Sequence, residues 1–395
     1  MKSEWTKKKL SDIADFNPRE TIKKGAIAKK IPMDVLRPFY RDIPYYVEEC
    51  FSGGTKFRNG DTIMARITPC LENGKTAQVS ILNDGEVGFG STEYIVFRAK
   101  EGIADKDYLY YLVCSPEVRE PAIKSMVGSS GRQRVQTDVV KNLEIDVPSL
   151  VEQEKIGSFL KTFDDKIALN DRINKNLEEQ SSTLFVNMFG HFIDSLDNSD
   201  IKLGDLIESV DNRGKTPPLS DEPTDYPIID VRALSGNSRI IDYTNCTKYV
   251  SKETYNNWFR SGHPKEYDIL ISTVGSLAEI KIFLGTTGCI AQNVVGFRTK
   301  GISPLYLYQY LNYIKNDLVA YNIGSVQPSI KVTHIIKHSI YVASKEDIEI
   351  FDSIARDITK KIFANCQENE ALKQIRDTLL PKLMSGELDV SNIEI

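Results

Sequence analysis

Two long segments of the chain, near residues 152–189 and 346–384, carry apolar residues at alternating steps of four and three. This spacing places the apolar side chains on one stripe of a helix, and it is typical of a coiled-coil seam that a partner helix covers. We therefore expect two long helices that pack against each other. The first stripe consists of Ile156, Leu160, Phe163, Ile167, Leu177, Leu184 and Met188.

The second segment repeats this stripe 195 residues later. The equivalent residues are Phe351, Ala355, Ile358, Ile362, Leu372, Leu379 and Leu383. Asparagines interrupt both stripes at the same offset, namely Asn170 and Asn174 in the first and Asn365 and Asn369 in the second. An asparagine in an apolar seam destabilises every register that leaves it unpaired. We predict that the four lie near the middle of an antiparallel helix pair and fix its register; exposure to water is the alternative.

The rest of the chain also repeats, because the same short motifs occur twice in the same order. The matching segments begin at Lys9 and Lys202, at Gly60 and Tyr267, at Tyr94 and Val294, at Tyr108 and Tyr306, and at Gly128 and Gly324. A repeated order of this kind indicates internal duplication.

Each repeat mixes short alternating β-runs, such as residues 62–67 and 269–274, with turns rich in Gly, Pro and Asn. Short helices are expected near Tyr108–Val113 and Tyr306–Ile314, and short strands around residues 143–147 and 340–342. We predict an α+β fold in which two repeated domains are joined by two long helices that form an antiparallel coiled coil with pseudo-twofold symmetry. The predicted boundaries are 1–150 and 196–345 for the domains, and 151–195 and 346–395 for the helices.

Composition fits a folded protein of more than one core, with 395 residues, 41% hydrophobic and 27% charged. The start of the chain lacks the apolar core of a signal peptide, and no apolar run is long enough to cross a membrane. We therefore expect a cytoplasmic protein. The six cysteines are scattered without a Cys-x-x-Cys pair, which disfavours disulfides and structural zinc.

Two further observations bear on ligands. His334 and His338 are four residues apart and could share a helical face, but the apolar residues around them favour a strand, so no metal site is expected. The net charge of −5 gives no general argument for nucleic acid, although basic residues crowd positions 23–41 and Arg132 and Arg134 flank a glycine-rich loop.

The duplicated layout resembles the HsdS specificity subunits of type I restriction–modification systems. The segments that carry the resemblance are Ala14-Asp-Phe-Asn-Pro-Arg-Glu, Gly128-Ser-Ser-Gly-Arg-Gln-Arg-Val, Val147-Pro-Ser-Leu-Val-Glu-Gln-Glu-Lys-Ile and Leu379-Leu-Pro-Lys-Leu-Met-Ser-Gly-Glu-Leu. The resemblance implies a non-catalytic subunit with two target-recognition domains, each recognising half of a split site in double-stranded DNA. It also implies docking of two modification (HsdM-type) subunits and of restriction (HsdR-type) subunits. S-adenosylmethionine, ATP and Mg²⁺ would belong to those partners, with no cofactor in this chain.

In this resemblance the paired helices act as the spacer between the half-sites. A helix of about 38 residues is roughly 57 Å long, which corresponds to about 17 base pairs as an upper bound on the half-site separation.

Candidate DNA contacts come from turns at matching places in the two repeats. Arg132 and Arg134 are the strongest candidates, because the neighbouring glycines let the backbone approach DNA closely. In the first domain the candidates are Arg58, Arg66, Thr68, Asn73, Lys75, Arg132, Gln133 and Arg134. In the second domain they are Lys215, Arg232, Ser272, Thr273, Ser276, Gln292, Asn293, Ser325 and Gln327.

Two alternatives from other classes stay open. Asp268, Glu279 and Lys281 fit the short Asp…Glu-x-Lys pattern of an Mg²⁺-dependent nuclease. A coiled-coil scaffold with two lobes unrelated to DNA would also fit the repeat. The Gly-Lys-Thr segments at Gly74 and Gly214 lack the earlier glycine of a phosphate-binding loop, and Asn17-Pro-Arg-Glu lacks the aromatic residue of an adenine methyltransferase motif.

Overall fold

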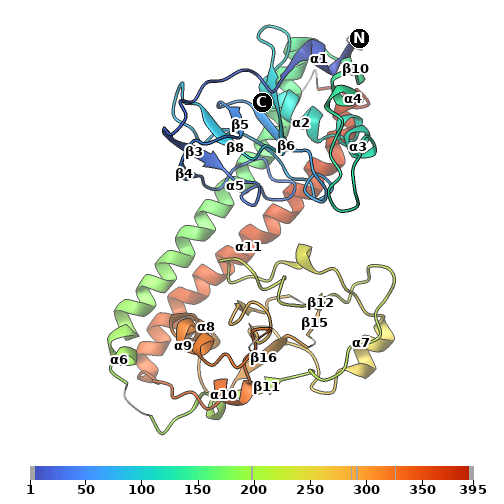
Figure 1. The fold of residues 1–395 in the computed structure, drawn as a ribbon. Coiled ribbons are helices and arrows are strands. Elements are labelled where there is room, and N and C mark those ends of the chain that lie inside the picture. Colours follow the sequence, from blue (N-terminus) through green and yellow to red (C-terminus); the bar gives the residue numbers. More distant parts are fainter. Residues whose placement is uncertain (1–4, 197–198, 286, 291, 325, 391–395) are drawn as a thin grey trace. The chain divides into compact units, whose positions relative to one another are not determined.

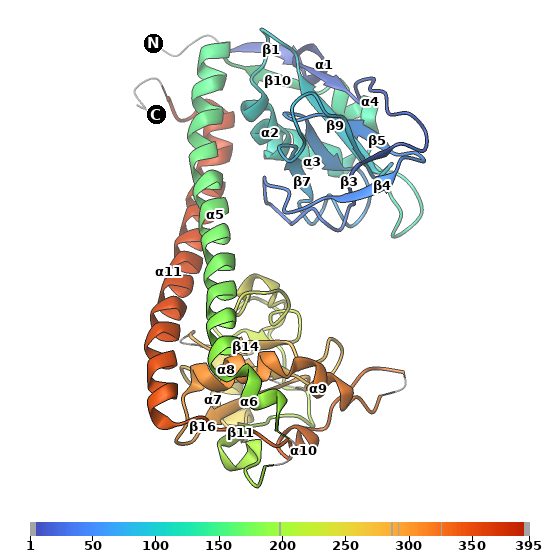
Figure 2. The same cartoon turned by 90° about the vertical axis from the view of Figure 1, so that its left-hand side faces the viewer.

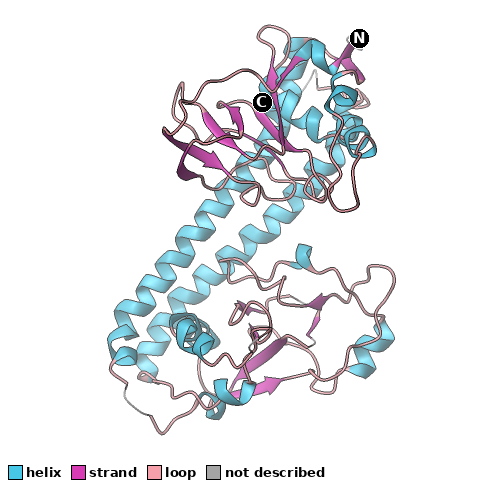
Figure 3. Ribbon diagram, viewed as in Figure 1, coloured by secondary structure: helices cyan, strands magenta, loops and turns pink. Residues whose placement is uncertain are grey.

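The computed structural model describes residues 5–196, 199–285, 287–290, 292–324 and 326–390. Contacts within the chain divide it into two units, the first comprising Met1–Leu169 with Glu368–Ile395 and the second Asn170–Gln367. Each unit contains one of the two repeats together with parts of both long helices. Both units combine short strands, helices and long loops (Figure 3), as an α+β fold requires. No helix in the described part of the chain has the length and apolar character of a membrane span.

The two predicted long helices are α5 (Leu150–Phe185) and α11 (Lys345–Met384). They run side by side in each unit (Figures 1 and 2). In the second unit Asn174 contacts Asn365, and further along α5 the ring of Phe185 lies 5.5 Å from that of Phe351. Residue numbers thus fall along α11 as they rise along α5, so the predicted antiparallel pairing is confirmed. A π-helical turn (Val186–Gly190) and α6 (His191–Asp194) follow α5.

The buried stripe of these helices differs in part from the predicted one. On α5 it includes Ile156, Leu160, Asp164, Ile167, Asn170, Asn174 and Ser181. On α11 the equivalents 195 residues later are Phe351, Ala355, Thr359, Ile362, Asn365, Asn369 and Arg376. Some predicted members are only partly buried, namely Phe163, Leu177, Leu184, Met188, Ile358, Leu372 and Leu379, whereas Leu383 is buried as predicted. The reason is that the buried stripe passes through polar residues that bond to the repeats, which a count of apolar residues alone misses.

All four predicted seam asparagines are buried. The side chain of Asn365 donates a hydrogen bond to Asn174 at 2.7 Å, and Asn174 also contacts the sulfur of Cys366 at 3.6 Å. Asn170 and Asn369 have partners as well. Their role in fixing the register stays a prediction.

The first repeat is built on two four-stranded sheets and a two-stranded one. The strand orders are β2-β9-β6-β7, β4-β3-β8-β5 and β1-β10. The strands are β1 (Thr6–Lys9), β2 (Ala14–Phe16), β3 (Ile27–Ile31), β4 (Val47–Cys50), β5 (Thr55–Phe57), β6 (Thr62–Ala65), β7 (Thr76–Gln78), β8 (Gly88–Gly90), β9 (Tyr94–Ala99) and β10 (Glu144–Val147). The helices are α1 (Leu10–Ile13), α2 (Lys106–Cys114), α3 (Pro116–Lys124) and α4 (Thr137–Lys141). The tyrosine-rich α2 is almost wholly buried in the core of this unit.

The second repeat has the same main sheet, with the strand order β11-β16-β13-β14, and a two-stranded sheet β12-β15. The strands are β11 (Ile207–Val210), β12 (Ile228–Ile229), β13 (Ile269–Ser272), β14 (Ile280–Ile282), β15 (Cys289–Ile290) and β16 (Val294–Thr299). The helices are α7 (Lys252–Trp258), α8 (Pro304–Tyr313), α9 (Lys315–Ala320) and α10 (Val332–Ile335), with 3-10 turns at Leu203–Asp205 and Tyr243–Asn245. The matching strand orders confirm the duplicated α+β domains.

The predicted strand at residues 340–342 is wrong, and so is the extended segment expected around His334. His334 lies in α10, and Ser339, just before the predicted strand, forms only an isolated bridge to Lys202. Ile335 is buried because it lies in a helical turn, and Ile340 is buried although its segment is irregular. These apolar residues are therefore explained without the alternating pattern of a strand. A short apolar run cannot separate these cases.

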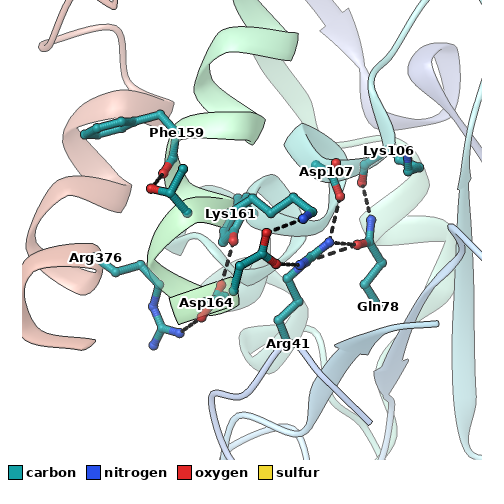
Figure 4. A network of polar contacts seen from close by, with 11 residues as sticks. Arg41, Gln78, Lys106, Asp107, Phe159, Lys161, Asp164 and Arg376 are labelled. Atoms are coloured by element: carbon teal, nitrogen blue, oxygen red, sulfur yellow. Dashed lines mark hydrogen bonds and ion pairs between the residues drawn. The ribbon is translucent and has the colours of Figure 1, made fainter. Parts of the chain in front are cut away.

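In the first unit a network of polar contacts around the buried Arg41 joins the repeat to the long helices (Figure 4). Arg41 donates to Gln78 of β7, to Asp107 of α2 at 3.0 Å and to Asp165 of α5 at 3.2 Å. Beside it, Asp164 of α5 accepts a 2.5 Å hydrogen bond from the Tyr111 hydroxyl and pairs with Arg376 of α11. This network holds the sheet, α2 and both long helices of the unit together.

The second unit has an arginine at the matching place. The backbone N–H of Gln78 donates to the carbonyl of Arg41 at 3.0 Å, and that of Ile282 donates to the carbonyl of Arg239 at 2.8 Å. Gln78 and Ile282 occupy equivalent positions in β7 and β14, so the two arginines correspond. Arg239 is fully buried and donates to Glu178 of α5 at 2.7 Å and to Thr359 at 2.6 Å.

Candidate nucleic-acid interface

The turns that carry most candidate DNA contacts occupy equivalent places beside the two main sheets. Arg66 follows β6, and its backbone N–H donates to the carbonyl of Glu93 at 2.9 Å; in the second repeat Thr273 donates to Asn293 at 2.8 Å. The remaining backbone hydrogen bonds and bridges match Val135 with Ile330, Arg134 with Ser329, Gln133 with Pro328 and Thr68 with Gly275. The candidates can therefore be compared position by position.

In the first repeat this place is charged. The exposed side chain of Arg134 forms a bidentate ion pair with Glu93, with Nε 2.9 Å and Nη2 2.6 Å from Oε1. The hydrogen bond from Arg134 holds the pKa of Glu93 below its usual value. Arg132 is exposed on the same loop, Gln133 is half-buried there, and Arg66 donates to the carbonyl of Val135 at 3.3 Å. Arg66, Arg132, Gln133 and Arg134 thus come together around one turn.

The other candidates of the first repeat differ in how free their side chains are. Arg58 is half-exposed and pairs with Glu20 at 2.8 Å, and Asn73 is exposed. The hydroxyl of Thr68 faces the sulfur of Met126 at 3.5 Å. Lys75 donates to the carbonyl of Met33 at 2.9 Å, so one of the three donors of its ammonium group is used within the protein.

In the second repeat the equivalent turns carry amide side chains in place of the charged ones, and they border a hollow. Three candidates, Gln292, Asn293 and Gln327, line a hollow of about 430 Å³. The amide of Gln292 donates to the hydroxyl of Thr216, which lines the same hollow. Gln292 has a positive φ of 62°, an uncommon conformation that a residue outside glycine adopts only where its surroundings fix it. The hollow therefore offers amide groups that both donate and accept, beside the charged Asp230 and Lys248 and several apolar residues.

The remaining candidates of the second repeat are divided between surface and interior. Lys215 and Ser276 are exposed, and exposed Arg232 pairs with Asp230 at 2.8 Å. Ser272 and Thr273 are buried, and their hydroxyls bond to the backbone carbonyls of Ser276 and Asn293 within the turn. Ser325 lies outside the described residues.

A family model for the "Type I restriction modification DNA specificity domain" matches this chain twice, at residues 2–179 and 196–368. The chain belongs to this family. Each match covers one repeat, so the repeats are here called the first and second specificity domains. The chain is accordingly a DNA-specificity subunit of the type I restriction–modification class.

Relatives and a solved structure agree with this assignment. The chain is 27% identical over 330 residues to the type I restriction enzyme MjaIX specificity subunit of Methanocaldococcus jannaschii, covering 74% of this chain and 71% of that protein. It is 24% identical over 409 residues to the HindI specificity subunit of Haemophilus influenzae, covering 84% and 87%. The crystal structure of a type I S subunit from M. genitalium has the same fold, with a TM-score of 0.56 at 16% identity over 96% of both chains.

Sequence reasoning missed residues that shape both specificity domains. Glu93 orients Arg134 in the first, and Thr216, Asp230 and Lys248 line the hollow of the second. Glu93 is one residue before the repeated segment that begins at Tyr94, and the alignment of the two repeats could have drawn attention to it, since Asn293 at the same place was a candidate. Lys248 lies outside the segments that recur in both repeats, so no pattern in the sequence pointed to it.

The side chains of the nuclease alternative are engaged elsewhere. The carboxylate of Asp268 pairs with Arg298 at 2.7 Å, Glu279 pairs with Lys315 at 3.2 Å, and Lys281 donates to backbone carbonyls. Asp61 and Arg98 form the same ion pair as Asp268 and Arg298 in the first domain, so this pair supports the fold of both domains. Among the described residues, no three His, Cys, Asp or Glu side chains group as metal ligands would.

Proposed function

We propose that each specificity domain recognises one half of a split site in double-stranded DNA and that the paired helices α5 and α11 set the separation of the halves. The observation that supports this proposal is the double match to the DNA-specificity domain, one match per repeat. A duplicated reader whose two copies differ at the same exposed turns is suited to recognise two different short sequences.

The chemistry of the two turns supports recognition rather than catalysis. Arg134 carries the forked donors that pair with guanine, while Gln292, Asn293 and Gln327 carry amides of the kind that pair with adenine. Arg132 and Lys215 are exposed cations that can contact phosphates. We propose that the chain itself is non-catalytic and binds no cofactor.

Catalysis would reside in partner subunits. We propose that two modification (HsdM-type) subunits, which would use S-adenosylmethionine, dock on this chain, and that restriction (HsdR-type) subunits with ATP and Mg²⁺ join them. The half-exposed apolar residues on the outer faces of the long helices, such as Leu169, Ile354 and Ile375, offer surface for such docking.

Methylome sequencing of a host that carries or lacks this chain tests the proposal. The expected result is one bipartite methylated motif, with two defined halves and a fixed gap, that disappears when the chain is deleted. Insertion of one heptad into both α5 and α11, which keeps the seam in phase, should lengthen the gap by about three base pairs, since seven helical residues add about 10 Å. An unchanged gap would contradict the spacer role, and the absence of any dependent motif would contradict DNA recognition.

A further inference from the structure

The charged turn of the first specificity domain contains an arginine whose donors are divided between the protein and solvent. Glu93 accepts from Nε and Nη2 of Arg134, at 2.9 and 2.6 Å. A guanidinium group has five N–H donors in a fixed plane. With one side of the plane held by Glu93, the end of the plane formed by Nη1 and Nη2 keeps one outward N–H on each nitrogen. The contact of Nη1 with the Arg132 carbonyl is long, at 3.4 Å.

Both partners of this pair are fixed at the backbone. Arg134 exchanges two backbone hydrogen bonds with Val127, at 3.0 and 2.9 Å. The N–H of Glu93 donates to the hydroxyl of Ser91 at 3.1 Å, and its carbonyl accepts from Arg66 at 2.9 Å. The Arg134 side chain is nevertheless 45% exposed, against 23% for Glu93. The carboxylate is thus the inner, supporting member and the guanidinium is the outer one.

The pair occurs in one domain only. The ion pair of Arg98 with Asp61 recurs in the second domain as Arg298 with Asp268, as expected of a contact that the fold needs. At the positions of Arg134 and Glu93, by contrast, the second domain has Ser329 and Asn293. A contact that recognises sequence should differ between two domains that recognise different sequences, and this one does.

We propose that the free Nη1–Nη2 end of Arg134 recognises a guanine in the half-site of the first specificity domain, and that Glu93 is a positioning residue that holds the guanidinium for this contact. The inference rests on the proposed function. Guanine presents two acceptors, O6 and N7, on its major-groove edge, and a bidentate arginine satisfies both. Glu93 contributes by removing rotational freedom from the arginine before DNA binds.

The test measures base preference with the complex of this chain and its modification subunits. Wild-type and variant complexes select from a library of duplexes with randomised half-sites, and the selected sequences are counted. For Arg134→Ala we expect a loss of preference for guanine at one position of one half-site by about 10-fold or more. Arg134→Lys should show the same loss because lysine lacks the fork. Glu93→Gln should cause a several-fold loss at that same position.

The second half-site serves as the internal folding control, since its preferences should persist in all three variants. Arg213→Ala removes a comparable bidentate pair, with Asp211, from the second domain and should leave the first half-site unchanged. Equal weakening of all sequences by Arg134→Ala, as expected for a phosphate contact, would overturn the inference, and so would an unchanged guanine preference. If the wild-type complex selects no split site, the proposed function itself fails and the inference fails with it.

Discussion

The two specificity domains attach to the long helices through equivalent arginines, but the charges of these arginines are neutralised in different ways. Arg41 in the first unit pairs with Asp165 and with Asp107, and the first of these carboxylates is about half-exposed. Arg239 in the second unit is completely buried and forms a bidentate pair with one carboxylate, Glu178. One junction is thus a branched network that reaches water, and the other is a single ion pair whose arginine is completely enclosed.

The polar residues of the helix seam also differ in charge between the two units. Asp164 pairs with Arg376 in the first unit, while their repeat equivalents in the second unit, Thr359 and Ser181, are uncharged and bond to Arg239 and Gln309. The two repeats have therefore kept polar residues at these seam positions but changed their charge and their partners. Buried charges are tolerated only with their partners. The polar residues of each specificity domain therefore fit the part of α5 and α11 that lies in the same unit.

The largest expected effect comes from removing the enclosed arginine. Arg239→Met leaves the partly buried Glu178 without its cation and should destabilise the second unit by about 3 kcal/mol. Arg41→Met should cost less, about 2 kcal/mol, because the N-terminus of α2 still stabilises the charge of the buried Asp107, while water and Lys161 compensate Asp165. Urea unfolding of both variants measures the difference.

A matched double variant separates charge from packing in that experiment. Adding Glu178→Met to Arg239→Met removes both charges and should recover most of the lost stability, since apolar pairs of similar size often replace buried ion pairs without loss. Equal costs for the two single variants would show that enclosure makes no difference between the junctions.

A smaller effect concerns a lysine that only the second domain has in its main sheet. Lys281 pairs with Leu270 across β13 and β14, where the first domain has Ala77 opposite Ile63. Burial lowers the pKa of Lys281 to about 8. Between pH 8 and about 10.4, where an unfolded lysine still holds its proton, the unfolded state binds more protons, so stability rises with pH.

The unfolding free energy of the wild-type chain should therefore rise by about 2 kcal/mol between pH 8 and 10 because of Lys281, and Lys281→Met should lack this rise. Unfolding curves measured at several pH values give the two slopes, and buried tyrosines and cysteines affect both proteins alike. Parallel slopes would mean that Lys281 keeps its proton in the folded state.

The repetition along the sequence predicts the helices and domains, but it does not show which polar residues are buried in the seam. The 195-residue offset identified both long helices and the duplicated domains, because apolar periodicity is a local property. It assigned Phe163 to the seam where Asp164 is buried, since the burial of a charged residue depends on a distant partner, Arg376. The candidate site shows the same limit. Arg134 stands out in a glycine-rich loop, but the Glu93 that orients it is 41 residues away.

The smallest expected effect tests a feature that the two repeats share. Asn365 donates to Asn174 in the seam of the second unit. Asn365→Leu alone strands the carbonyl of Asn174 and should cost about 1–2 kcal/mol. The double variant Asn174→Leu and Asn365→Leu removes both polar groups, so its stability should return to that of the wild type or exceed it.

Stability and register should then separate. If the asparagine pair fixes the register, the double variant should be stable and yet yield methylated motifs with more than one gap length, because alternative registers of the helix pair then strand fewer polar groups. A paired substitution at a shared apolar position, Ile167→Leu with Ile362→Leu, changes the seam without removing a polar group and should keep the single gap. A stable double asparagine variant with one unchanged gap would assign the register to the domain junctions instead, and with it the difference between Arg41 and Arg239.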